Sequence, residues 1–337
     1  MFKNKLHFIP FLILLLSFLH SENACCRFEK YKIGFLLADL SIERWSKDRD
    51  FFLASANKEG IEVIVANAEN DQNKQIQQAE EMIKAGVKAI VVVPVDAYLA
   101  APIVEKAHKN GIKVVAYDRI IMNSDLDLYI SYDNEMVGKI MAIYVSIRIK
   151  KGNFVYIGGP NSDRNAYYMH SGIMNILKPY IDNKSICFVC DTFANNWNEQ
   201  EAINIINKYF EKGNPTPDVI FAGNDQLAQG IINVLEQKGL SGKVMVTGQD
   251  ADLMACRNLI CGKQLLTIFK PIRTLADRAV LLTSGLLGNI PYNTTTTVFN
   301  GKTEVSAFLL NPVPVDKNNL KTSVIFDNFH TEDEIYK

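Results

Sequence analysis

The stretch "KAIVVVPVDAYLAAPIVEKAHKNGIKVVAYDRII" (residues 88–121) contains two apolar runs, at 88–95 and 112–117. Both runs are rich in β-branched residues and apolar apart from Lys88 and Lys113, which is typical of strands buried on both faces of a sheet. The segment between them, 98–111, is amphipathic and predicts a helix that ends at its Asn–Gly pair. A strand, a helix and a second strand in this order form the parallel unit of an α/β fold.

The same alternation of strand and helix fills most of the chain. It begins with the predicted strand 32–38, the helix 44–60 and the strand 61–68, and it restarts after residue 130. The sequence therefore predicts two doubly wound lobes, each with a parallel sheet covered on both sides. Neither half has a Gly-rich dinucleotide fingerprint or a phosphate loop, and the Gly158–Gly159–Pro160 corner is interpreted as a tight strand exit.

The composition limits the possible partners. The 337 residues are 48% hydrophobic and carry a formal net charge of −1, which suits globular domains with sizeable cores. This charge gives no overall attraction to nucleic acid or to anionic lipid. We therefore expect no nucleic-acid partner.

The first 26 residues differ from the rest. Lys3 and Lys5 precede the apolar run "FIPFLILLLSFL" (8–19), which predicts a signal peptide or a membrane anchor and an exported body. Cleavage, lipidation at Cys25 or Cys26, and retention as an anchor all stay open. We expect one of these routes to keep the protein associated with the membrane.

Six cysteines at irregular spacing do not form a disulfide framework in a chain of this length. The segment "CFVC" (187–190) reads as a buried strand, in which residues three apart lie on opposite faces and cannot bridge. We expect Cys187 and Cys190 to be core residues, and we expect no metal site and no cofactor.

Polar residues gather where the predicted strands end. Ligands of parallel sheets bind beyond the carboxyl ends of the strands, so these positions form the candidate site. They are Asp39, Arg44, Asp96, Asp118, Arg119, residues 161–165, residues 191–197, Asn224, Asp225, Asp250 and Lys270. Any one of them, such as Asp96 or Asp225, could instead cap a helix. Their recurrence at successive strand ends indicates a site.

Carboxylates, amides and guanidinium groups occur together in this set, with Trp45 and Trp197 nearby in the sequence. A sugar hydroxyl can donate to a carboxylate and accept from Arg, Lys or Asn, and the apolar face of a sugar ring packs on an indole. The mixture favours a neutral, polyhydroxylated ligand. We expect the two indoles to cover opposite faces of one ring.

Several segments resemble the xylose-binding branch of the type I periplasmic binding-protein family. They are "LSIERWSKDRDFF" (40–52), "VVVPVDA" (91–97), "KVVAYDRII" (113–121), "YISYDNEMVG" (129–138), "GLSGKVMVTGQDADL" (239–253), "TIFKPI" (267–272) and "PVPVDKNNL" (312–320). These segments stand in the order of the family and span nearly the whole chain after residue 30.

The resemblance implies two lobes, joined by three chain crossings, that close over a sugar. We expect the crossings near Ser131, Lys270 and Val305. The first lobe would then contain residues 31–131 and 271–305, and the second lobe residues 132–270 and 306–337, after the signal peptide or anchor of residues 1–26.

The resemblance also implies which residues contact the ligand, for which a pentose, D-xylose, is expected. Carried over by motif, they are Arg44, Trp45, Asp118, Arg119, Asn165, Trp197, Asn224, Asp250 and Lys270. His170 stands where this branch usually has arginine, and we include it as a further contact. A shorter, titratable side chain there could change affinity or the choice of pentose, or it could simply pack beside Tyr167 or Tyr168.

The expected function is an exported sugar receptor that presents its ligand to a membrane permease of the ABC class. The alternative is a membrane-associated xylose sensor that regulates a sensor histidine kinase. A glycosidase is disfavoured, because Arg119 and Lys270 would keep Asp118 and Asp250 ionised as hydrogen-bond acceptors. A repressor of the same fold is also disfavoured, because residues 1–30 contain no helix-turn-helix pattern.

Overall fold

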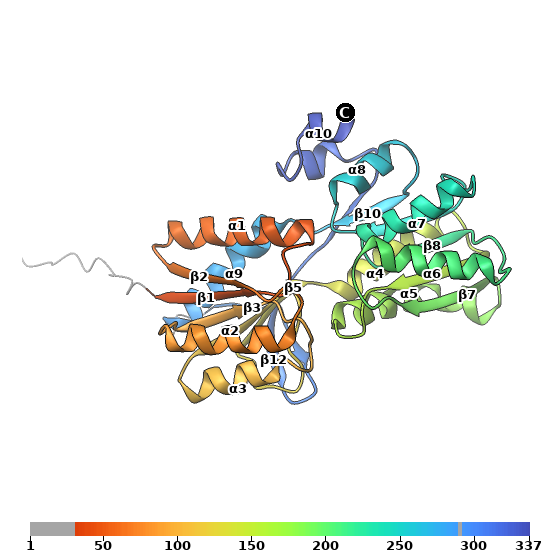
Figure 1. The fold of residues 1–337 in the computed structure, drawn as a ribbon. Helices are drawn as coiled ribbons and strands as arrows, with labels where there is room; N and C mark the ends of the chain where they lie inside the picture. The colour runs from red at the N-terminus through yellow and green to blue at the C-terminus, as the bar shows by residue number, and fades with distance from the viewer. Residues whose placement is uncertain (1–30, 289–291) are drawn as a thin grey trace, which may run out of the picture.

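The computed structural model describes residues 31–288 and 292–337, which form two α/β lobes side by side (Figure 1). The first lobe is built on a seven-stranded sheet and the second on a six-stranded sheet. Strand pairs along both sheets are mainly parallel, so the predicted fold class is confirmed. The predicted signal peptide or anchor, residues 1–26, lies outside the described residues.

The first sheet has the strand order β11-β12-β5-β4-β3-β1-β2. Helices α1 and α9 pack together on one face, and α2 and α3 pack together on the other. The strands of this lobe are β1 (Lys32–Leu37), β2 (Glu62–Asn67), β3 (Ala89–Val92), β4 (Lys113–Tyr117), β5 (Leu128–Tyr132), β11 (Thr296–Phe299) and β12 (Glu304–Leu310). Its helices are α1 (Glu43–Lys58), α2 (Gln72–Lys84), α3 (Ala101–Lys109) and α9 (Ile272–Leu287).

The second sheet has the order β13-β10-β9-β8-β6-β7, with α4 against α5 on one face and α6 against α7 on the other. Its strands are β6 (Gly152–Gly158), β7 (Ile186–Phe193), β8 (Val219–Ala222), β9 (Met245–Gln249), β10 (Leu266–Phe269) and β13 (Val313–Val315). The helices of this lobe are α4 (Asn134–Ser146), α5 (Arg164–Asp182), α6 (Glu199–Glu211), α7 (Asp225–Gln237) and α8 (Leu253–Ile260). The chain ends with the π-helical turn η1 (Lys321–Ile325) and α10 (Glu332–Tyr336), which packs on α8.

Three segments connect the two sheets: one after β5, one after β10 and one after β12. The first two lie beside the expected positions at Ser131 and Lys270. The third lies between Leu310 and Val313 rather than at Val305, because β12 continues past Val305 and pairs with β5 from Ala307 to Leu310. An apolar strand end therefore extends the first lobe beyond the expected boundary.

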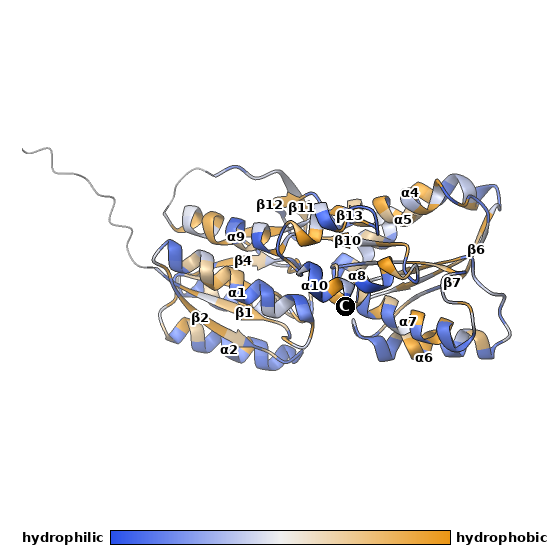
Figure 2. Cartoon of the chain, turned by 90° about the horizontal axis from the view of Figure 1, so that it is seen from above, coloured by the Kyte–Doolittle hydropathy of each residue, from blue (hydrophilic) through white to orange (hydrophobic). Residues whose placement is uncertain are grey.

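Each lobe has its own hydrophobic core, and the helices turn their hydrophilic sides outward (Figure 2). Val114, Val115 and Tyr117 of β4 are fully buried, as the opening stretch predicts. Across the described ranges, 31–288 and 292–337, we find no helix with the length and apolar character that a membrane crossing requires.

The cysteine prediction is only partly correct. Cys187 and Cys190 are free thiols as expected, but Cys187 is exposed and Cys190 is half-buried. The reason is that β7 is the edge strand of the second sheet, so its residues are covered on fewer sides. Cys256 on α8 is buried, whereas Cys261 at the end of that helix is exposed.

Two glycines allow α4 and α5 to pack closely. A Cβ atom built on Gly138 would lie 1.9 Å from the carbonyl oxygen of Met169, and one built on Gly172 would lie 2.1 Å from that of Glu135. Both contacts are with backbone atoms, which cannot move aside as a flexible side chain can. This close packing fixes α5, whose first turn contributes to the site described below.

We expect Gly138→Ala to lower the free energy of unfolding by about 1–3 kcal/mol, the usual cost of overpacking a well-packed core. The measurement is urea denaturation followed by far-UV circular dichroism. Met136→Ala, at an exposed position on the same helix, serves as the control and should change stability by less than about 0.5 kcal/mol. Equal stability of the two variants would contradict the packing argument.

Candidate functional site

A small cavity of about 30 Å³ lies where the carboxyl ends of the strands of the two lobes face each other. Both lobes line it, with Ile42, Arg44, Trp45, Asp118, Arg119, Asp163, Asn165, Trp197, Asn224, Gln249, Asp250 and Lys270. A cavity of this volume holds about one or two water molecules. A sugar can therefore enter only if the lobes or the lining side chains move.

Nine of the ten residues predicted as ligand contacts line this cavity; His170 does not. The imidazole of His170 lies 3.0 Å from both carboxylate oxygens of Asp191 and packs edge-on against Tyr156, with ring centroids 4.7 Å apart. Its partners belong to β6 and β7 of the second lobe. The aromatic packing beside Tyr156 corresponds to the alternative role for His170, although with a different tyrosine.

Arg44, near the start of α1, is the centre of the ionic contacts. Its guanidinium lies 3.3 Å from Asp48 one turn later, 3.1 Å from Asp118 of the same lobe and 3.3 Å from Asp250 of the other lobe. Burial opposes the charged form, yet these three carboxylates raise the pKa of Arg44 above its ordinary value. Arg44 is therefore a permanent cation shared by the two lobes.

Asp118 ends β4 in a left-handed backbone conformation, with φ at +61°. Its carbonyl oxygen accepts hydrogen bonds from the hydroxyl of Ser131 at 2.7 Å and from the amide of Asn165 at 3.1 Å. Burial disfavours ionisation, but Arg44 and Lys270 lower the pKa of Asp118 below its ordinary value. The carboxylate is thus ionised at neutral pH and accepts hydrogen bonds rather than donating a proton.

Asp163 lies within the strand-end residues 161–165 of the candidate site, but it is not among the ten expected ligand contacts. Its Oδ1 caps α5 by accepting from the backbone N–H of Asn165, and its Oδ2 lies 2.7 Å from Nε of Arg119 across the lobes. The same Oδ2 accepts from the indole of Trp197 at 3.2 Å. From the sequence, an aspartate at the start of a helix is interpreted as a cap. The second role of Asp163, its ion pair with Arg119, becomes visible only when the two lobes are placed together.

Two glycines position the indole of Trp197. A Cβ atom on Gly159 would lie 2.2 Å from this ring, and one on Gly223 would lie 3.0 Å from it. The ring therefore packs on the backbone that leaves β6 and β8, at a distance that other residues would prevent. The corner at Gly159 therefore has a second role besides ending the strand, because it leaves room for the indole of Trp197.

Trp45 lies on the first lobe and is 3% exposed. The guanidinium carbon of Arg44 lies 4.3 Å from its ring centroid, and that of Arg119 lies 5.5 Å away. Both distances are within the range of cation–π contacts. The two indoles do line one cavity from opposite lobes, and their packing against two faces of one sugar ring stays a prediction.

Two asparagines of the second lobe lie at the N-termini of helices, which fixes the positions of their side-chain amides. Asn224 caps α7 by accepting from the backbone N–H of Leu227, and its amide donates to the carbonyl of Trp197 at 3.3 Å. Asn165 lies in the first turn of α5 and donates to the carboxylate of Asp118 at 3.3 Å. Helix capping therefore fixes amide groups at the edge of the cavity.

Asp250 follows β9, and its carboxylate lies 3.0 Å from the ammonium of Lys270 at the end of β10. Asp250 and Ala251 both have positive φ, at 96° and 56°. The next two backbone N–H groups are bound, that of Ala251 by Thr267 at 3.2 Å and that of Asp252 by Asp225 at 3.1 Å. These contacts hold a strained turn that presents Asp250 to the cavity.

Asp225 organises this support from inside the second lobe. Its carboxylate accepts from the hydroxyl of Thr267 at 2.7 Å and from the amide of Gln264 at 2.8 Å. Burial raises the pKa of Asp225 to about 8, and nearby Asp250 adds to the shift. Burial, together with the charge of Asp225, also raises the pKa of Asp252 well above its ordinary value.

The cavity is balanced in charge. It is lined by three cations, Arg44, Arg119 and Lys270, and by three carboxylates, Asp118, Asp163 and Asp250. An anionic or cationic ligand would upset this balance, whereas a neutral ligand with many hydroxyl groups can donate and accept throughout it. In residues 31–288 and 292–337 no group of three or more His, Cys, Asp or Glu residues could hold a metal ion.

A two-lobed α/β fold with a polar site between the lobes defines a class of binding proteins that close on their ligands. Residues 33–289 match the model of the periplasmic binding protein domain, and the chain belongs to this family. Membership agrees with the expected location outside the cytoplasm.

The chain is 38% identical to the D-xylose-binding periplasmic protein of Escherichia coli (strain K12), over 96% of this chain and 98% of that protein. It is 39% identical to the protein of the same description from Haemophilus influenzae, over 90% and 92% of the two chains. A solute-binding protein of an ABC transporter from Clostridium phytofermentans, solved with bound β-D-glucose, superposes with a TM-score of 0.82 at 30% identity, covering 90% of this chain and 99% of that one. The chain is thus a sugar-binding protein of this family.

The titration of Asp225 predicts how stability varies with pH. Its folded pKa of about 8 lies above the ordinary value of 3.8, so the folded chain holds a proton that the unfolded chain releases. The stabilisation is therefore complete below about pH 4, and it is lost as pH rises through about 8, at up to about 1.4 kcal/mol per unit. Asp225→Asn should flatten this fall in the free energy of unfolding between pH 5 and 8.

Urea denaturation at a series of pH values measures this slope. Asp182→Asn, which removes an exposed carboxylate near the end of α5, is the matched control and should keep the parent slope. A parent slope retained by Asp225→Asn would show that Asp225 is ionised throughout this range.

Proposed function

We propose that this protein is an exported receptor for a pentose, with D-xylose as its ligand. The observation that carries the proposal is the cavity between the lobes, in which three cations face three carboxylates beside two indoles. This arrangement suits a small neutral ligand with hydroxyl groups on every side and an apolar ring face.

The relatives support xylose in particular. Two proteins described as D-xylose-binding are 38% and 39% identical over nearly the whole chain. More distant relatives include the multiple sugar-binding periplasmic protein SbpA of Azospirillum brasilense, at 30% identity. The stronger similarity to the xylose-binding proteins favours a pentose over a hexose.

The proposed ligand contacts are the nine predicted residues that line the cavity, together with Asp163. They are Arg44, Trp45, Asp118, Arg119, Asp163, Asn165, Trp197, Asn224, Asp250 and Lys270. His170 is not among them, because its imidazole is bound to Asp191 instead. Any effect of His170 on affinity would be indirect, through its contact with Tyr156 or through α5, the helix to which His170 belongs.

The ligand acts by favouring closure of the lobes. Arg44, Asp118 and Arg119 precede the first crossing, whereas Asn165, Trp197 and Asn224 follow it. A sugar that touches both groups makes all its contacts only when the lobes meet, so it shifts the population toward the closed form. About 5.5 kcal/mol of differential affinity moves a two-state equilibrium from 1:99 to 99:1, which a few charge-assisted hydrogen bonds can provide.

The receiving partner is an ABC permease that recognises the relative placement of the two lobes. Solved relatives described as solute-binding proteins of ABC transporters support this partner. The sensor alternative is less favoured: the fructose-binding domain of a two-component system is only 22% identical and shares the fold alone. Retention at the membrane through residues 1–26 stays a prediction.

Replacing Asp250 tests the proposed site directly. Asp250→Ala should weaken xylose binding at least tenfold in isothermal titration calorimetry, because hydrogen bonds to a charged group contribute about 1.5–3 kcal/mol each. Asp191→Ala is the matched control, since this exposed carboxylate lies in β7 of the second lobe and does not line the cavity. Equal affinities of the parent and Asp250→Ala would show that Asp250 does not contact the ligand. If the parent binds none of xylose, ribose, arabinose, glucose and galactose, the proposal that the protein is a sugar receptor is refuted.

Trp45 and Trp197 are the only tryptophans of the chain, so intrinsic fluorescence reports on the cavity. Xylose should shift or quench the emission as contacts with a sugar ring replace the guanidinium contacts of Trp45 and change the surroundings of Trp197. Trp197→Phe should keep only the part of the change that belongs to Trp45. An unchanged spectrum at a xylose concentration that calorimetry shows to be saturating would exclude the indoles as sugar platforms.

A further inference from the structure

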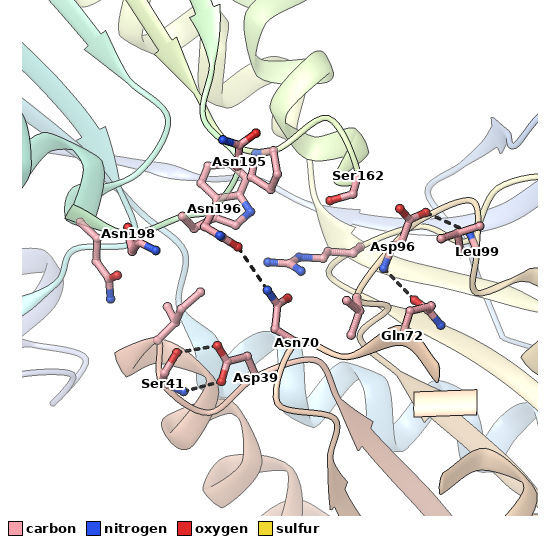
Figure 3. A pocket seen from close by; sticks show the side chains of 16 residues that line it. Asp39, Ser41, Asn70, Gln72, Asp96, Leu99, Ser162, Asn195, Asn196 and Asn198 are labelled. Carbon is pink, nitrogen blue, oxygen red and sulfur yellow. Dashed lines mark hydrogen bonds between the residues drawn. The ribbon is translucent and has the colours of Figure 1, made fainter. Parts of the chain in front are cut away.

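A second cavity, of about 310 Å³, also lies between the lobes, and Figure 3 shows the side chains that line it. The two cavities share Ile42, Arg119 and Trp197 as lining residues. The second cavity lies on the side of β2 and β7, the edge strands farthest from the crossing segments. Its volume falls at the lower end of the range of small-molecule sites, roughly 300–1,000 Å³.

Both lobes build this second cavity. The first lobe contributes the loops after β1, β2 and β3, and the second lobe contributes the loops after β6 and β7 and the start of α7. The amide of Asn70 donates to Asn196 across the lobes at 3.2 Å, and the backbone N–H of Ala97 donates to the carbonyl of Ser162 at 2.9 Å. Closure of the lobes therefore completes this cavity together with the smaller one.

Amide side chains dominate the lining. Six of them face the cavity: Asn70, Gln72, Asn195, Asn196, Asn198 and Gln226. An amide both donates and accepts hydrogen bonds without carrying charge, which matches the hydroxyl groups of a neutral ligand.

The charged side chains of the lining are already bound within the protein. Asp39 accepts from the backbone and hydroxyl of Ser41, and Asp96 accepts from two backbone N–H groups of the following turn. Arg119 is paired with Asp163 at 2.7 Å. Most of the amides also have a partner within the protein: Asn70 binds Asn196, Gln72 accepts from the backbone of Asp96, Asn195 donates to Glu201 and Asn198 caps α6. Each bound amide keeps a further donor or acceptor for a neutral ligand, and the amide of Gln226 makes no side-chain hydrogen bond to the described residues.

We propose that the second cavity is a subsite for a second sugar unit. The receptor then takes not only a free pentose but also a neutral disaccharide, with one ring in the small cavity and the next beside Trp197 and the amides. This inference rests on the proposed function, since it extends the same ligand across the same cleft. The two cavities border the same three side chains, so the two rings of a disaccharide would lie next to each other once the small cavity opens for its sugar.

Gln226 offers a variant specific to the subsite. It lies in the first turn of α7, lines only the larger cavity, and makes no side-chain hydrogen bond to any of the described residues. Gln226→Leu keeps the approximate size of the side chain and removes its donor and acceptor. Gln237→Leu, at the exposed end of the same helix, is the matched control.

The test is calorimetric titration of the full chain with xylose and with β-1,4-xylobiose freed of xylose. We expect the parent to bind both sugars, and we expect Gln226→Leu to weaken xylobiose about 2- to 12-fold, the effect of one hydrogen bond, while xylose changes less than twofold. Gln237→Leu should match the parent for both sugars.

Three outcomes would overturn the subsite. Binding of xylose without xylobiose would refute it and leave the proposed function intact. Equal weakening of both sugars by Gln226→Leu, or no weakening of xylobiose, would show that the second ring does not occupy this cavity. Binding of neither sugar would refute the proposed function itself.

Discussion

The pairing of one buried guanidinium with carboxylates from both lobes is the interaction on which the site depends. Arg44 touches Asp48 and Asp118 of its own lobe and Asp250 of the other. A buried charge is costly unless it is paired, so each of these groups is stable only in the presence of the others. The same pairing lets a neutral ligand exchange contacts with them without adding charge, because a hydroxyl can replace either member of an ion pair as a hydrogen-bond partner.

This pairing requires two aspartates to stand at unusual backbone positions. Asp118 and Asp250 end strands of different sheets, and both have positive φ, a conformation that is costly for residues other than glycine but is tolerated by aspartate. Each is held from behind, Asp118 by Ser131 and Asn165 and Asp250 by the turn that Asp225 supports. The scaffold beneath the cavity thus offsets strain at the carboxylates themselves.

The two cavities of the cleft differ in the kind of side chain that lines them. The small one, nearer the crossing segments, is ionic and balanced, and the larger one, nearer the edge strands, is lined mainly by amides. Trp197 borders both, and its place depends on the close approach that Gly159 and Gly223 allow. A ligand therefore meets a strongly polarising region at one end and a neutral hydrogen-bonding region at the other, with an aromatic surface between them.

Hydrophobic periodicity predicts the order of strands and helices, and parallel strands bring their carboxyl ends to one edge, so the two α/β lobes and nine of the cavity-lining residues were predictable from the sequence by itself. The sequence did not determine partners across space. His170 stands where the resemblance places an arginine that contacts the ligand, yet its ring is bound to Asp191 and packs against Tyr156 instead. Asp163 reads as a helix cap until Arg119 of the other lobe lies against it. Tertiary structure alone decided these roles, because an ion pair between lobes depends on distances that no local pattern encodes.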